Sequence, residues 1–176
     1  ATLVFSEMAS EFSANFDSFS SVSLKIYERV SHARMLNLFN LLKQEMVVFL
    51  QDGYRVLETG PNSNLALELR KPIPETPLGM WLEGEGRKEY GHLPSFNLLM
   101  SPYATIHNGY QDVLDQISQQ HWDSDSIKLS RILSLFQNIE NHSSEFVLNV
   151  DKLIEEKRKF ESTHSTSAKE SDVELF

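Results

Sequence analysis

The chain has 176 residues, of which 40% are hydrophobic and 23% charged, an ordinary composition for one globular domain with a substantial core. Its net charge of −9 argues against binding to nucleic acid or to anionic membrane surfaces, because both need clustered Lys and Arg. The absence of cysteine excludes disulfides, thiol nucleophiles and thiolate metal ligands. The sequence contains no apolar run of membrane-spanning length and no basic leader with a cleavage site, so we expect a cytoplasmic protein.

The N-terminal segment carries a heptad pattern. Phe5, Phe12, Phe19 and Ile26 are spaced by seven residues, and Met8 and Val22 occupy a second seam. This pattern predicts a coiled-coil-like helix over residues 1–25. Its many serines lower the helix propensity, so we expect it to need a partner helix, and we expect a homodimer.

An apolar face continues to Leu50, and Gly53 stands where this first helix is expected to stop. All six prolines lie between Pro61 and Pro102, and six of the seven glycines lie between Gly53 and Gly91. This distribution predicts an irregular central insert with a short helix near 65–70.

Two further helices are predicted after the insert. Ser95 is expected to cap a helix that runs to Ile117, and Asp123-Ser-Asp-Ser is expected to cap the last one. From Glu161 the composition turns to Ser, Thr, Lys and Glu, which is typical of a flexible tail. The predicted fold class is therefore all-α: an antiparallel bundle of about four helices over residues 26–160, with a long N-terminal helix and a tail over 161–176.

Two positions on one predicted helix have a spacing that suits a metal site. Tyr103 and His107 lie one turn apart on one face of a predicted helix, so their side chains can converge. A His on a facing helix and a group from a Pro- and Gly-constrained turn, such as the one that follows Thr76, would complete a tetrahedron, the geometry of zinc sites.

The segment 76–107 resembles the chemoreceptor zinc-binding domain, a bacterial sensor module. The resemblance rests on matching residues and on the 27- and 31-residue intervals that separate Thr76 from Tyr103 and His107; the matching residues are Leu78, Gly79, Trp81, Glu85, Gly86, Gly91, Pro94, Phe96, Pro102 and His107. It implies a helical bundle, a homodimer, and a zinc site in which His32 and His107 are ligands. Leu78, Gly79 and Trp81 would form the turn, with Trp81 as its core anchor.

The chain departs from this pattern at two ligand positions. Thr76 stands where the resemblance implies a Cys, and Tyr103 where it implies a His. A neutral hydroxyl binds zinc weakly, and a phenol with an ordinary pKa near 10 is costly to ionise at neutral pH. We therefore expect zinc to be lost, with His32 and His107 as core histidines bonded to Thr76 and Tyr103. The alternative is that the two histidines still bind a divalent ion weakly.

The C-terminal pentapeptide offers a second signal. Asp172, Val173, Glu174, Leu175 and Phe176 form an apolar end on a polar tether, which can dock into a partner. The segment resembles the pentapeptide with which some chemoreceptors hold adaptation enzymes, and it also resembles a sliding-clamp-binding peptide. An end without a partner is the third interpretation.

Together these features predict a non-catalytic sensory or regulatory domain of a bacterial chemotaxis-type signalling protein, since no nucleophile–base pair or carboxylate pair stands out. Its partners would be a second copy and a chemoreceptor or other signalling module. The alternative is a metal-independent adaptor that acts through its acidic surface or its tail.

Overall fold

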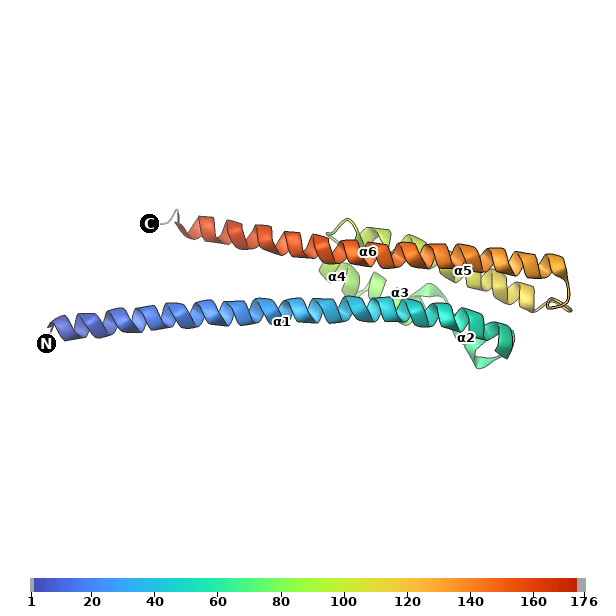
Figure 1. The fold of residues 1–176 in the computed structure, drawn as a ribbon, viewed down its shortest axis with the longest axis horizontal. Coiled ribbons are helices and arrows are strands. Elements are labelled where there is room, and N and C mark those ends of the chain that lie inside the picture. The colour runs from blue at the N-terminus through green and yellow to red at the C-terminus, as the bar shows by residue number, and fades with distance from the viewer. Residues whose placement is uncertain (1, 174–176) are drawn as a thin grey trace. The chain divides into compact units, whose positions relative to one another are not determined.

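The computed structural model describes residues 2–173, with the side chains of residue 4 and of residues 6–164, and every regular element in that range is helical (Figure 1). The predicted all-α class is confirmed. In chain order the elements are α1 (Thr2–Thr59), α2 (Asn64–Leu69), η1 (Ile73–Glu75), α3 (Pro77–Glu83), α4 (Glu85–Tyr90), η2 (Phe96–Leu98), α5 (Met100–Ile117) and α6 (Ser126–Val173). Within the described range, no helix combines the length and the apolar character that crossing a membrane requires.

The chain divides into two compact units, Ala1–Leu38 and Phe39–Phe176, and α1 runs through the boundary as one helix. The boundary thus falls at 38/39, whereas the sequence pattern suggested a change near residue 25. In the second unit, α6 runs antiparallel to α5 and to residues 39–59 of α1 (Figure 1).

The prediction that α1 stops at Gly53 is wrong, because the helix continues to Thr59. Gly53 is buried, and a Cβ atom there would lie 2.2 Å from Cε1 of Tyr110. Tyr110 packs edge-on against Phe49 with ring centroids 4.7 Å apart, and its hydroxyl donates to the carbonyl of Phe49 at 2.8 Å. The glycine therefore serves helix packing, and its helix-stop signal is overridden by tertiary contact.

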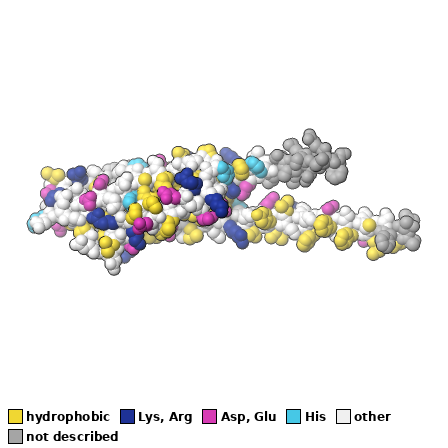
Figure 2. Space-filling view, turned by 180° about the vertical axis from the view of Figure 1, so that it is seen from behind, with side chains coloured by type: hydrophobic (Ala, Val, Ile, Leu, Met, Phe, Trp, Pro, Cys, Tyr) yellow, Lys and Arg dark blue, Asp and Glu magenta, His cyan; other side chains and the backbone are white. Residues whose placement is uncertain are grey.

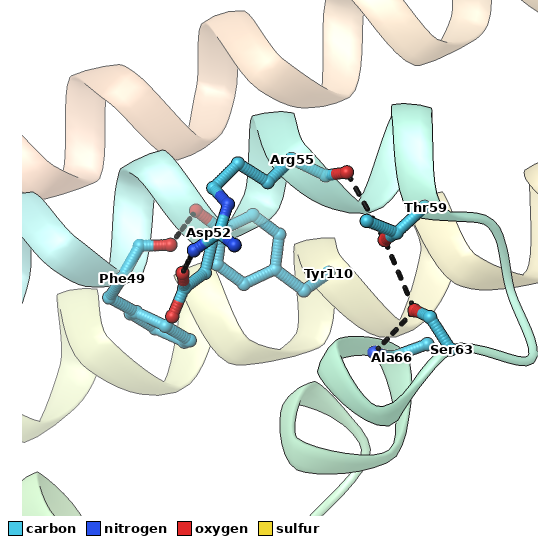
Figure 3. A network of polar contacts seen from close by, with 7 residues as sticks. All are labelled: Phe49, Asp52, Arg55, Thr59, Ser63, Ala66 and Tyr110. Carbon is cyan, nitrogen blue, oxygen red and sulfur yellow. Dashed lines mark hydrogen bonds and ion pairs between the residues drawn. The ribbon is translucent and has the colours of Figure 1, made fainter.

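The actual end of α1 lies at Gly60, whose φ of +91° is a conformation that glycine adopts readily. Figure 3 shows how polar contacts fasten this end: the Thr59 hydroxyl donates to the carbonyl of Arg55, and it also meets the hydroxyl of Ser63 at 3.1 Å. Ser63 Oγ in turn accepts from the backbone N–H of Ala66 and so caps α2. The short helix expected near 65–70 is thereby confirmed.

Three apolar seams form the core of the second unit. Most members follow the previous one after three or four residues, the spacing at which one helix face meets its neighbours, and on α1 the half-buried Phe49 and the buried Gly53 fill the interval between Met46 and Val56. The buried members are Phe39, Leu42, Met46 and Val56 on α1, Tyr103, Ile106, Tyr110, Val113, Leu114 and Ile117 on α5, and Ile132, Phe136, Ile139, Phe146, Val150 and Leu153 on α6. Ser143, which interrupts the α6 pattern in the sequence, is buried in the seam with 4% of its surface exposed.

The central insert is a succession of short helices rather than an irregular segment. The sequence suggested that the side chain of Ser95 caps the following helix, but this side chain makes no capping hydrogen bond. The hydroxyl and backbone N–H of Ser95 both donate to the carboxylate of Glu156 on α6, at 2.6 and 2.9 Å. This long-range contact fastens the start of η2 to α6, and sequence spacing alone carries no signal for it.

The last helix begins as predicted, because Asp125 Oδ1 accepts from the backbone N–H groups of Ile127 and Lys128. Its other end differs from the expected tail at 161, since the backbone stays helical to Val173. Lys157 and Glu161 form an ion pair at i, i+4, and Thr163 bonds to the carbonyl of Lys159. Lys and Glu are good helix formers, so a polar composition did not by itself imply disorder here.

Candidate functional site

The structure brings two of the four predicted site residues into direct contact. Thr76 precedes α3, and Tyr103 lies in the first turn of α5, where 2% of its surface is exposed. Their hydroxyl oxygens are 2.6 Å apart, although the residues are separated by 27 positions in the chain.

The hydrogen bonds of Thr76 determine what its hydroxyl can still do. The group donates its one proton to the carbonyl of Ile73 at 2.7 Å and accepts from the backbone N–H of Gly79 at 3.1 Å. Tyr103 must then be the donor in the 2.6 Å contact, which occupies the second lone pair of Thr76. The hydroxyl of Thr76 is therefore saturated and has no lone pair left for a metal ion.

Tyr103 is equally poorly suited to metal binding. Burial, above all, raises the pKa of Tyr103, and the charge of Glu45 adds to the rise. A phenol coordinates metal ions well only as a phenolate, and this pKa keeps the proton in place at neutral pH. The residues at positions 76 and 103 therefore do not fit a zinc ion.

His107 is buried one turn further along α5, with 8% of its surface exposed. Its Nε2 lies 2.7 Å from the carbonyl oxygen of Lys71, which can only accept, so Nε2 carries a proton. The expected partners of this histidine were Thr76 and Tyr103. That expectation is wrong, because those two residues bond to each other and His107 bonds to the backbone before η1.

His32 lies half-buried on α1 and belongs to the first unit. The site contacts described above therefore involve only positions 76, 103 and 107, which belong to the second unit. Among the side chains that the structure describes, no three of His, Asp and Glu form a group that would hold a metal ion. Every buried side-chain nitrogen or oxygen in this part of the chain has a hydrogen-bond partner.

The residues of the predicted turn, Leu78, Gly79 and Trp81, lie in α3, directly after Thr76. A Cβ atom on Gly79 would lie 1.9 Å from the carbonyl oxygen of Ile73, so only glycine fits there. Leu78 is buried, and Trp81 is half-buried with its ring 5.8 Å from that of Phe96. The segment is thus a helical turn whose close approach to η1 positions Thr76.

A pocket of about 180 Å³ opens beside the Thr76–Tyr103 pair. Its lining comes from Glu45, Val48, Phe49, Asp52, Glu68, Leu69, Thr76, Pro77, Leu78 and Tyr103. Three carboxylates and no cationic side chain line it, while Phe49 and Tyr103 contribute aromatic faces 5.6 Å apart between centroids. The pocket is therefore mostly apolar, and two of its carboxylates are paired with cations outside the lining, Asp52 with Arg55 and Glu68 with Lys71.

A second cavity of about 360 Å³ lies between the end of α1 and the start of α6, in a region to which the sequence assigned no site. Tyr54 and Phe136 stack at its side with centroids 4.5 Å apart, and Tyr54 donates to the carboxylate of Glu140. That bond raises the pKa of Tyr54, with burial and the charge of Glu140 as lesser causes. Its lining is mostly apolar, and the only sequence signal for it was the shared spacing of the α6 seam.

The predicted partner-binding pentapeptide lies at the edge of what the structure describes. Asp172 and Val173 belong to the last turn of α6, and their side chains, like Glu174, Leu175 and Phe176 as a whole, are outside the described residues.

No family model matches this chain, and comparison with curated proteins and with solved structures finds no match either.

Proposed function

We propose that this chain is a non-catalytic sensory or regulatory domain of a chemotaxis-type bacterial signalling protein, acting in the cytoplasm as a homodimer. In this proposal a hydrogen-bonded pair has replaced the metal. The supporting observation is the buried contact between the hydroxyls of Thr76 and Tyr103. These are the two positions that, by resemblance to the chemoreceptor zinc-binding domain, would be a Cys and a His ligand. Two hydroxyls bonded to each other keep the same two elements joined without a metal ion.

The pocket beside the pair supplies the proposed input. Glu45, Phe49 and Asp52 of α1 line it, and α1 is one uninterrupted helix between them and its N-terminal residues. In this proposal an event in the pocket shifts the part of α1 that lines it, the kind of small helix shift that other switches use. A repacking of one wall of the pocket is sufficient input, so no chemical reaction is required.

The proposed ancestry of the site is tested by restoring its ligands. Calorimetry with zinc on the double variant Thr76→Cys/Tyr103→His should give a Kd below about 1 µM, because a thiolate and an imidazole recover most of a structural zinc site. Adding His107→Ala should abolish this binding. The matched control is Thr76→Cys/Thr105→His, which places the new histidine about 200° around α5 from position 103 and should bind far more weakly.

Two outcomes would contradict the proposal. If a folded Thr76→Cys/Tyr103→His protein bound zinc no better than the control, positions 76, 103 and 107 would not be a former metal site. If the unaltered chain bound zinc with sub-micromolar affinity and lost it with His32→Ala, the two histidines would still form a working metal sensor, and hydrogen bonds would not have replaced the metal.

A further inference from the structure

The first unit exposes an unusual apolar surface. Along α1 its large side chains recur at steps of three or four residues, and between 46% and 73% of each is exposed: Met8, Phe12, Phe16, Phe19, Val22, Ile26 and Val30, here called the N-terminal seam. Hydrophobic side chains recur along this part of the helix in Figure 2. Soluble proteins rarely expose such a continuous apolar patch without a partner.

The size of the seam is that of an interface. A phenylalanine side chain contributes roughly 150–250 Å² when it is buried, so the three exposed ones in each of two copies supply several hundred Å². The aliphatic members raise this toward the roughly 1,200–2,000 Å² that stable protein interfaces bury. Because Phe12, Phe19 and Ile26 within the seam repeat every seven residues, the partner with matching geometry is another helix with the same repeat.

The polar residues within the repeat distinguish the two directions of such a pair. In heptad terms Phe12, Phe19 and Ile26 are at a, Met8, Asn15, Val22 and Arg29 are at d, and Glu11 and Lys25 are at g. A parallel pair in register sets Arg29 against Arg29 of the partner subunit inside the seam. It also sets Glu11 and Lys25 opposite apolar e positions, Phe16 and Val30, so neither charge finds its opposite. Paired Asn15 amides would be its one polar gain.

An antiparallel pair centred near Asp17 removes the conflicts at Arg29, Glu11 and Lys25, while it sets Asn15 against Phe19 of the partner subunit. It sets Phe12 against Val22 of the partner subunit and Ile26 against the partner's Met8, and it moves the two Arg29 side chains to opposite ends. Glu11 then faces Lys25 of the partner subunit, and the two-fold axis makes this pair twice. The two Phe16 rings meet at the axis.

We propose that a second copy of this chain covers the N-terminal seam in the antiparallel direction, with two symmetric Glu11–Lys25 ion pairs. This inference refines the homodimer of the proposed function and does not depend on the zinc-site ancestry. Opposite charges at facing g positions favour this direction, and like charges at Arg29 disfavour the other.

Spin labels on the full chain measure the direction, and the absence of native cysteine makes single-cysteine labelling clean. Ser6→Cys lies about 11 residues from the proposed axis, so two labels should be more than about 30 Å apart at 1.5 Å per residue. In a parallel pair the same labels would lie within about 20 Å. Ser20→Cys is the matched control near the axis, where either direction gives a short distance.

A charge exchange tests the ion pairs themselves. Glu11→Lys and Lys25→Glu should each raise the dimer Kd several-fold, measured by analytical ultracentrifugation, and the double exchange should restore it. Both residues are exposed, so circular dichroism should confirm unchanged helicity. Three results would overturn the inference: a short distance between the two labels at position 6, a dimer Kd of the double exchange no lower than those of the single exchanges, or a chain that stays monomeric at millimolar concentration. The zinc test of the proposed function would stand on its own result.

Discussion

The contact between Thr76 and Tyr103 allows a quantitative test of whether two hydroxyls have taken over a structural role. In Thr76→Val the shape of the side chain is nearly kept, but α3 loses its N-cap bond to Gly79, which costs about 1 kcal/mol. The buried hydroxyl of Tyr103 also loses its acceptor, at about 1–3 kcal/mol. The expected total is about 2–4 kcal/mol of unfolding free energy.

Tyr103→Phe should cost less, because it removes the donor and leaves Thr76 with its bonds to Ile73 and Gly79. We expect about 0.5–1.5 kcal/mol. In the double variant the phenol is gone and only the N–H of Gly79 has lost its partner, so the cost should approach that of the lost cap, about 1–2 kcal/mol. The double-mutant cycle should therefore show a coupling of about 1–3 kcal/mol.

Urea denaturation followed by circular dichroism at pH 7 measures these values. Two controls are available: Thr105→Val, which removes a hydroxyl bonded only to its own helix, and Tyr27→Phe, at a side chain that is 70% exposed. Both should change stability by less than about 0.5 kcal/mol. Additive costs in the double variant would refute the reasoning, because the two hydroxyls would then not act as a pair, and the proposed replacement of the metal would lose its support.

Further predictions concern packing, pH and the tail. Gly53→Ala should destabilise the fold by about 1–3 kcal/mol in urea denaturation, despite the better helix propensity of alanine, because the new Cβ meets the ring of Tyr110. In a Tyr110→Leu background this clash is gone, and the same substitution should be neutral or stabilising. A destabilisation that persists in that background would contradict the packing argument. Burial raises the pKa of Tyr90 to about 12 and also raises the pKa values of Tyr103 and Tyr110. The stability from these tyrosines is therefore fully present below pH 10, and it should fall above pH 10 by about 1.4 kcal/mol per pH unit for each of them. Tyr103→Phe should make the fall of the unfolding free energy between pH 10 and 11 shallower, and an equal fall would count against a raised pKa of Tyr103. Deleting residues 161–176 should leave zinc binding by Thr76→Cys/Tyr103→His unchanged in calorimetry, because every residue that lines the pocket precedes it; a protein whose only detectable partner is lost with the deletion would instead be an adaptor.

Much of the fold could be predicted from short-range features of the sequence. Steps of three and four residues on α5 and α6 indicate helices because they place apolar side chains on one face, whatever the partner. Asp125 caps α6 through N–H groups two and three residues ahead, a contact that local geometry alone provides. The predicted convergence of the positions of Thr76 and Tyr103 depended instead on a constrained turn at a fixed distance from a helix.

The tertiary structure decided which polar atoms meet and which local signals are overridden. Gly53 reads as a helix stop, yet it lies within α1 because the ring of Tyr110 needs the space of a missing Cβ. The partner of His107 is the Lys71 carbonyl, and that of Ser95 is Glu156 on another helix. Periodicity and helix capping involve residues only a few positions apart, so they can be predicted from the sequence. Contacts of this kind depend on how distant helices cross, and that is settled only when the whole chain packs.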